Sequence, residues 1–151
     1  MAPKKWKRWK RRSTIKLVDW KRNNKIAIRN FNESCDTHDL IKMELVRMLR
    51  RSFPSADAVP IYTEFDSTQI EPDNPSSFAD VWLRDGNGGI YVWEIQKDIN
   101  HDWLDKISKK HENVTLIIVD LKQVEKDWEM FIKNGRDPTT ALREALKNYV
   151  I

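Results

Sequence analysis

A glycine-rich turn in the middle of the chain constrains the fold more than any other segment. Two runs rich in β-branched and aromatic residues flank the sequence DGNGG at residues 85–89. Such runs on either side of a glycine-rich turn predict an antiparallel β-hairpin. A symmetric hairpin centred on Asn87 pairs Asp80 directly with Glu94, one residue on each strand.

The alternation of side chains separates the two faces of this hairpin. One face carries the polar residues Asp80, Glu94 and Gln96. The opposite face carries four apolar residues, Val81, Leu83, Trp93 and Ile95. We expect the polar face to be covered as well, because it also holds Phe78, Trp82, Ile90 and Val92. The alternative is that both acids lie on a solvated sheet face, where the same alternation occurs.

The pairing of two acids predicts a metal site. Opposed side chains on one sheet face have Cβ atoms about 5 Å apart, so two carboxylates there repel each other unless a cation lies beside them. Oxygen ligands of this kind suit Mg²⁺ or Mn²⁺. Glu44 is a third candidate ligand, because it interrupts the apolar stripe of a predicted helix between Ile41 and Met48. Glu64 follows an apolar strand and is either a further ligand or an edge residue.

Periodicity and capping residues place the other elements. We expect strands at 15–20, 26–29, 59–65 and 114–119, and helices at 37–52, 101–112, 121–133 and 138–149. Residues 66–77 contain two prolines and are expected to form a loop that contacts substrate. The run at 114–119 is continuously apolar, which is typical of a strand buried on both faces.

The order of these elements predicts an α/β fold with a mixed central sheet of four or five strands, flanked by helices. The helix at 101–112 connects the strand of Glu94 to the strand at 114–119. Such a crossover makes these two strands parallel.

At this point the sequence resembles the PD-(D/E)XK nuclease superfamily. Ala79-Asp80 stands at the Pro-Asp position, and Glu94-Ile95-Gln96 stands at the Glu-x-Lys position. Glu44 matches an acidic residue often found on the first helix. The resemblance covers roughly residues 37–120 and implies a restriction-endonuclease-like αβββαβ core. A small domain with a basic arm is also similar to the nucleases and Holliday-junction resolvases of archaea and their viruses.

Gln96 is the main departure from the superfamily pattern. The lysine that usually stands there positions and polarises the attacking water, and some members carry glutamine instead. Lys97 does not replace it simply, because the next residue of a strand points to the opposite face. Lys106 on the following helix is expected to reach back in its place. Under this resemblance Asp80, Glu94 and Gln96 are the catalytic residues.

The N-terminal segment is strongly basic. Residues 1–29 hold twelve Lys/Arg and one acid, a net charge of +11, whereas the remaining 15 Lys/Arg and 22 Asp/Glu give −7. We expect a flexible arm over residues 1–12 and a single nuclease-like domain over residues 13–151. The residues of the arm expected to bind nucleic acid are Lys4, Lys5, Trp6, Lys7, Arg8, Trp9, Lys10, Arg11 and Arg12.

Three interpretations of this arm remain open. Its cations bind phosphates while its tryptophans stack on exposed bases, or it lies on an anionic membrane, or it is a solubilising or targeting tail. We favour the first, because the rest of the chain independently indicates phosphodiester chemistry. DNA is therefore the expected partner. Relatives that cut both strands often act as dimers, so a homodimer is an open alternative, although the sequence holds no dimer motif.

Other features exclude several classes of protein. No run reaches the ~18 apolar residues of a membrane span, and no signal peptide is expected. A single cysteine, Cys35, permits no internal disulfide, so we expect a cytoplasmic protein, in the host cytoplasm if it is viral. His38, His101 and His111 lack the spacing of zinc ligands. His38 shares a helix face with Ile41 and Leu45, which is compatible with a place near the site, but a capping or surface role is the favoured interpretation.

The expected function is metal-dependent hydrolysis of phosphodiester bonds in DNA. Asp80 and Glu94 would bind Mg²⁺ or Mn²⁺, with Glu44 as a further ligand, and Gln96 would orient the water. The alternative is a catalytically inactive nucleic-acid-binding protein on a nuclease-like scaffold. A third interpretation is a membrane-surface or virion structural protein.

Overall fold

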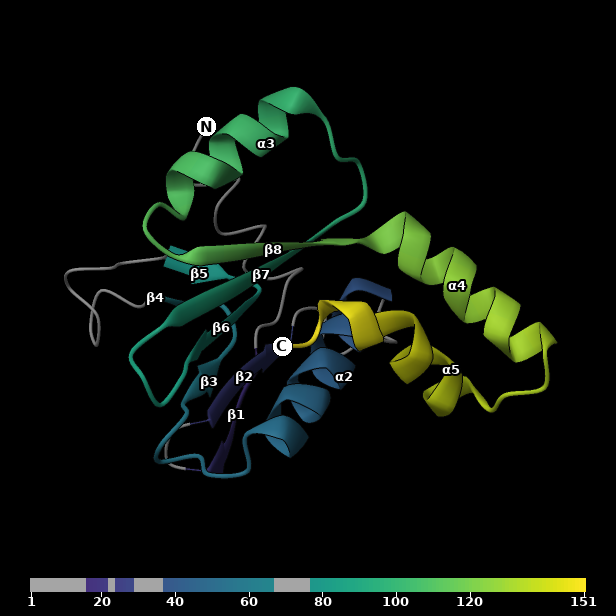
Figure 1. Cartoon of the computed structure of the whole chain (residues 1–151), viewed down its shortest axis with the longest axis horizontal. Helices are drawn as coiled ribbons and strands as arrows, with labels where there is room; N and C mark the ends of the chain where they lie inside the picture. The colour runs from purple at the N-terminus through teal and green to yellow at the C-terminus, as the bar shows by residue number, and fades with distance from the viewer. Residues whose placement is uncertain (1–15, 22–23, 29–36, 67–76) are drawn as a thin grey trace.

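The computed structural model describes residues 16–21, 24–28, 37–66 and 77–151 (Figure 1). Its elements follow in the order β1 (Lys16–Lys21), β2 (Asn24–Ile28), α2 (Thr37–Ser52), β3 (Ile61–Tyr62), β4 (Phe65–Asp66), β5 (Ser77–Ala79), β6 (Val81–Arg84), β7 (Ile90–Gln96), α3 (His101–Lys110), β8 (Thr115–Asp120), α4 (Leu121–Lys133), α5 (Pro138–Leu146) and the 3₁₀ turn Lys147–Tyr149. The predicted α/β class is confirmed. None of the described helices is long and apolar enough to cross a lipid bilayer.

Six strands form one mixed sheet in the order β1-β2-β3-β6-β7-β8. The pairs β2–β3 and β7–β8 are parallel, whereas β1–β2, β3–β6 and β6–β7 are antiparallel. The predicted parallel crossover through α3 is therefore confirmed. The sheet has more strands than predicted, because the N-terminal hairpin β1–β2 joins it through β3. A separate small sheet pairs β4 with β5.

The central hairpin has the predicted register. Val81 pairs with Trp93 and Arg84 pairs with Ile90 across the β6–β7 ladder. Oδ1 of Asp85 accepts hydrogen bonds from the amides of Asn87 at 2.9 Å and Gly89 at 2.8 Å, which closes the turn. This local network fixes the register without help from distant segments.

The two faces of the hairpin pack into two apolar clusters, as predicted. Val81, Leu83, Trp93 and Ile95 are buried in the larger cluster with residues of α2, α4 and α5. Trp82, Ile90 and Val92 are buried in a smaller cluster with Tyr62 and Ala79. In Figure 1, α3 lies across β8 from α2 and α5, so helices flank the sheet on both sides. The hairpin is therefore the centre of the fold.

The predicted helices are confirmed with small shifts at their ends. The side chains of Asn100, Asp120 and Asp137 each accept a backbone N–H at a helix start, which is the usual N-cap arrangement. Helix α3 ends at Lys110, two residues earlier than predicted, with His111 as its C-cap. The last predicted helix changes to a 3₁₀ turn after Leu146.

Three local predictions were wrong. The strand expected over residues 59–65 is split into β3 and β4, because Glu64 adopts a left-handed backbone with φ of 50°. Strand β8 lies at a sheet edge with Thr115 exposed, so it is not buried on both faces along its whole length. Phe78 was expected to be covered, but its side chain is exposed. Most of the loop predicted over residues 66–77 lies outside the described residues.

Candidate functional site

The candidate site lies at the end of the β6–β7 ladder where β6 begins. Asp80 lies in a bend between β5 and β6, opposite Glu94 on β7. Phe78 has φ of 53° and Glu64 has φ of 50°, and non-glycine residues in this region cost about 1–3 kcal/mol each. These two turns redirect the chain so that β5 pairs with β4. Asp80 therefore makes its hydrogen bonds to β7 with its side chain as well as its backbone.

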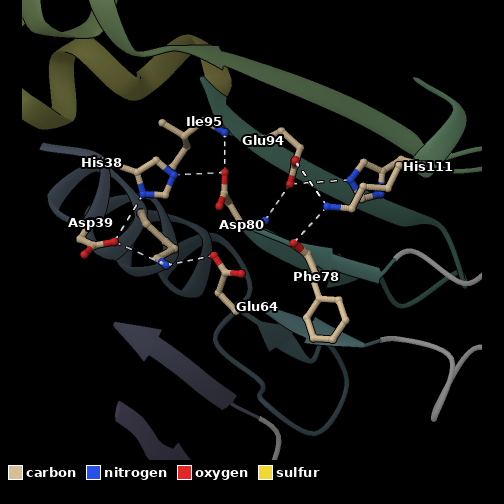
Figure 2. A network of polar contacts seen from close by, with 10 residues as sticks. His38, Asp39, Glu64, Phe78, Asp80, Glu94, Ile95 and His111 are labelled. Atoms are coloured by element: carbon tan, nitrogen blue, oxygen red, sulfur yellow. Dashed lines mark hydrogen bonds and ion pairs between the residues drawn. The ribbon is translucent and has the colours of Figure 1, made fainter. Parts of the chain in front are cut away.

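Asp80 and Glu94 are joined by reciprocal hydrogen bonds. The amide of Asp80 donates to Oε1 of Glu94 at 3.0 Å, and the amide of Ile95 donates to Oδ2 of Asp80 at 2.7 Å. The two acids are only 9% and 7% exposed. The interpretation that they lie on a solvated sheet face is therefore wrong. Each buried carboxylate is oriented by the main chain of the opposite strand (Figure 2).

His38 adds a cationic partner to Asp80 from the first turn of α2. Its Nε2 lies 3.3 Å from Oδ2 of Asp80, and its Nδ1 lies 3.4 Å from Oδ1 of Asp39. Burial opposes the charged imidazole, but the hydrogen bond and charge of Asp80 outweigh it, so the pKa of His38 is raised. Burial likewise opposes the Asp80 carboxylate, and His38 outweighs it, so the pKa of Asp80 is lowered. The capping or surface role favoured from the sequence is therefore wrong, and the other interpretation, proximity to the site, is the one the structure supports.

A buried lysine extends this network toward β3. Lys42 is fully buried on α2, and its Nζ lies 3.7 Å from Oδ1 of Asp39 and 3.6 Å from Oε1 of Glu64. Its positive charge also contributes to lowering the pKa of Asp80. Because a buried charge requires compensation, Asp39 and Glu64 stabilise Lys42 in this position. Neither Asp39 nor Lys42 was singled out from the sequence.

Helix α3 supplies a second pair of basic groups, on the side of Glu94. Nζ of Lys110 lies 3.9 Å from Oε2 of Glu94 and donates to the carbonyl of Phe78 at 3.4 Å. Nε2 of the buried His111 lies 3.7 Å from Oε1 of Glu94. Lys106 was expected to reach this site, but the structure brings Lys110 there, one helical turn later. The apolar residues of α3 gave no signal that its last turn faces Glu94.

The assembled network is dense in charge. Four carboxylates face two lysines and two histidines within it. Clusters of buried titratable groups with perturbed pKa values are typical of functional sites. Within the described ranges, no set of three or more His, Cys, Asp and Glu side chains is arranged to hold a metal ion.

Two predicted site residues lie apart from this network. Glu44 accepts a hydrogen bond from Nε of Arg143 on α5 at 2.8 Å and pairs with Arg47 at 3.4 Å. The structure therefore does not bring Glu44 to Asp80 and Glu94. Gln96 follows Glu94 on the same face of β7, but its side-chain amide donates to the carbonyl of Asp98 at 3.2 Å.

A basic cavity lies beyond the carboxyl ends of β7 and β8. It has a volume of about 360 Å³ and is lined by three lysines, Lys97, Lys122 and Lys126. Asp98 forms an ion pair with Lys122 at 2.9 Å, and the Asp120 side chain caps α4. The cavity begins next to Gln96, because Asp120 is the register partner of Gln96 across β7–β8.

Comparison with protein-family models, with curated proteins and with solved structures gave no match to this chain. The basic arm, residues 1–12, lies outside the described residues. The function is therefore argued below from the geometry of the carboxylate network and from the sequence pattern.

Proposed function

We propose that this chain is a metal-dependent nuclease that hydrolyses phosphodiester bonds of DNA at Asp80 and Glu94. The observation that carries the proposal is the buried, hydrogen-bonded pairing of these two carboxylates at the break in the central hairpin. Burying a pair of acids costs free energy of folding. Such pairs are therefore typical of functional sites. The order α2, β3, β6, β7, α3, β8 supports a restriction-endonuclease-like core.

The donor chemistry of the pair fits Mg²⁺ or Mn²⁺. Asp80 and Glu94 would hold the ion, since both present hard carboxylate oxygens from adjacent strands. When bound, the ion would lower the pKa of a water and neutralise charge on the scissile phosphate. His38, Lys110 and His111 compensate the same carboxylates in its absence. A divalent ion would therefore compete with these basic groups for Asp80 and Glu94.

The surrounding side chains have distinct proposed roles. Lys110 supplies the positive charge that the superfamily pattern places on the strand, because its Nζ already lies 3.9 Å from Glu94. Gln96 orients the attacking water from the same face of β7 as Glu94. His38 holds Asp80 in place, and Asp80 in turn raises the pKa of His38.

Nucleic acid is the proposed partner because two basic regions accompany the carboxylates. The lysines of the cavity beside Gln96 supply positive charge for a phosphate near the proposed site of cleavage. The arm adds seven Lys/Arg and no acid over residues 1–12. Phosphate contacts of this kind provide most of the affinity of proteins for DNA.

The experiment that tests this function is cleavage across a panel of substrates. Purified protein is incubated with supercoiled plasmid, linear duplex, single-stranded and branched DNA, with Mg²⁺, with Mn²⁺ or with chelator. We expect cleavage only with a divalent ion, and loss of cleavage in Asp80→Asn. Intact DNA under every condition would contradict the proposal.

The alternative function is nucleic-acid binding without cleavage, on the same scaffold. One observation favours it, namely that two histidines and one lysine already lie against the two carboxylates that a metal would need. This alternative predicts salt-dependent DNA binding that is unaffected by chelator, with no cleavage product. The substrate panel distinguishes the two functions directly.

A further inference from the structure

An exposed aromatic residue lies in the chain just before the carboxylate network. Phe78 is 56% exposed, although the residues after it in the chain are buried. It stands two positions before Asp80, and Figure 2 shows its ring directed away from the two carboxylates. An exposed phenylalanine by itself is unremarkable, because folded proteins leave many single apolar side chains in water.

The backbone of Phe78 distinguishes it from such incidental cases. Its φ of 53° lies in the left-handed region, which bulky residues rarely adopt. Strained residues of this kind persist where the surrounding structure enforces them, and they cluster at functional sites. Here the carbonyl of Phe78 accepts a hydrogen bond from Lys110 at 3.4 Å.

Lys110 connects the position of Phe78 to Glu94. The same Nζ that binds the Phe78 carbonyl lies 3.9 Å from Oε2 of Glu94. The other large apolar side chains that are exposed among the described residues belong to different elements, such as Leu40 on α2 and Met130 on α4. The Phe78 carbonyl thus contacts Lys110 beside Glu94, while the exposed ring points away from the two carboxylates.

We propose that the Phe78 ring stacks on an unpaired DNA base next to the phosphate that is cleaved. The inference rests on the proposed nuclease function and names its substrate class as single-stranded DNA or DNA with unpaired bases. An aromatic ring stacks on any base without reading its identity, but the faces of bases inside a duplex are already covered by their neighbours. Stacking at Phe78 therefore selects for unpaired DNA.

The test measures binding of the full-length protein to DNA in chelator, so that no cleavage occurs. The probe is a single-stranded oligonucleotide with one central 2-aminopurine, whose fluorescence falls when an aromatic ring stacks on it. A duplex of the same sequence serves as the second probe. The variants are Phe78→Ala, Phe78→Leu and Phe78→Trp, with Met130→Ala as the matched exposed control.

The expected result is a loss of roughly 5- to 150-fold in single-strand affinity for Phe78→Ala and Phe78→Leu, the range for removal of one base-stacking contact. Duplex affinity changes by less than about threefold, and the quenching of 2-aminopurine is reduced. Phe78→Trp restores both the affinity and the quenching, while Met130→Ala matches wild type. Phe78→Leu separates stacking from apolar burial, because leucine keeps bulk without a ring face. Thermal unfolding confirms that each variant is folded.

Two outcomes would overturn the inference. One is unchanged single-strand binding in folded Phe78→Ala and Phe78→Leu, and the other is an equal loss on both probes. If wild type cuts DNA with Mg²⁺ and either outcome is found, stacking is excluded and the nuclease function remains. If wild type cuts no DNA but the selective loss occurs, the stacking contact is supported and the hydrolysis is excluded.

Discussion

The backbone amide of Asp80 donates a hydrogen bond to Oε1 of Glu94 at 3.0 Å, across the two strands of the central hairpin. In return, the carboxylate of Asp80 accepts the amide of Ile95, the residue after Glu94, at 2.7 Å. Each acid therefore occupies a position that its partner's strand defines, and displacing one strand moves both carboxylates together.

This relationship predicts that Asp80 contributes to stability as well as to chemistry. Asp80→Ala removes the acceptor of a buried N–H, which costs about 1–3 kcal/mol in the free energy of unfolding. Asp80→Asn retains an acceptor oxygen, so we expect a smaller loss together with the loss of cleavage. Denaturant unfolding of the two variants measures this difference. Equal stability of Asp80→Ala and wild type would show that the hydrogen bond to Ile95 does not contribute.

Lys110 is predicted to support catalysis more than Lys106. Lys110→Ala should lower the cleavage rate by about ten- to a thousandfold, the range found for loss of a single stabilising group. Lys106→Ala is the matched control, because Lys106 lies one turn earlier on α3 and is exposed. Rates at saturating DNA separate this effect from weaker binding. A normal rate for Lys110→Ala with an inactive Lys106→Ala would restore the original prediction from the sequence.

The His38–Asp80 pair predicts a specific pH dependence of stability in the metal-free protein. Because the pKa of His38 is raised, its contribution to the free energy of unfolding is fully present below about pH 6.5. That contribution is lost as the pH rises through the raised pKa. Because the pKa of Asp80 is lowered, its contribution to the free energy of unfolding is fully present above about pH 3.9. That contribution is lost as the pH falls through the lowered pKa.

The difference in melting temperature between wild type and His38→Gln should therefore be largest between about pH 4 and pH 6.5. It should shrink on either side of this window. The measurement is thermal unfolding in chelator across a pH series. A difference that does not vary with pH would contradict the ion pair and leave only a packing role for His38.

Deleting residues 1–12 should flatten the salt dependence of DNA binding. If four or five of the seven basic residues contact phosphate, the slope of log affinity against log salt on duplex DNA becomes shallower by roughly four units. The cleavage rate at saturating DNA should change far less, because the carboxylates lie in the body of the protein. Replacing Trp6 and Trp9 by alanine should weaken single-strand binding more than duplex binding. Unchanged DNA affinity with loss of liposome binding would favour a membrane role for the arm.

The hairpin was predictable because its information is local. Asp85, the glycines and the alternation of apolar residues determine the β6–β7 register within a short segment, so Asp80 and Glu94 were paired correctly from the sequence. The strand order through α3 was predictable for a similar reason, since a helix between two strands favours a parallel crossover.

The remainder of the site depends on contacts between distant segments. Glu44 matched a motif position, but Arg143, far away in the sequence, binds its carboxylate instead. His111 and Lys110 reach Glu94 only because α3 ends where it does, and helix ends are poorly defined by periodicity. The left-handed backbone of Phe78 and the β4–β5 pairing next to it were indicated by no local pattern.

The measurement that tests the central claim most directly is the rate of plasmid cleavage by wild type and by Glu94→Gln, purified in parallel. Glutamine retains an oxygen for the Asp80 amide but removes the charge that would bind the metal. The account predicts cleavage by wild type with Mg²⁺ or Mn²⁺ only, and at least a hundredfold slower cleavage by Glu94→Gln, about the loss expected for one key stabilising group. DNA affinity should stay within a few-fold of wild type. Cleavage by Glu94→Gln at the wild-type rate, or cleavage by wild type in chelator, would contradict it.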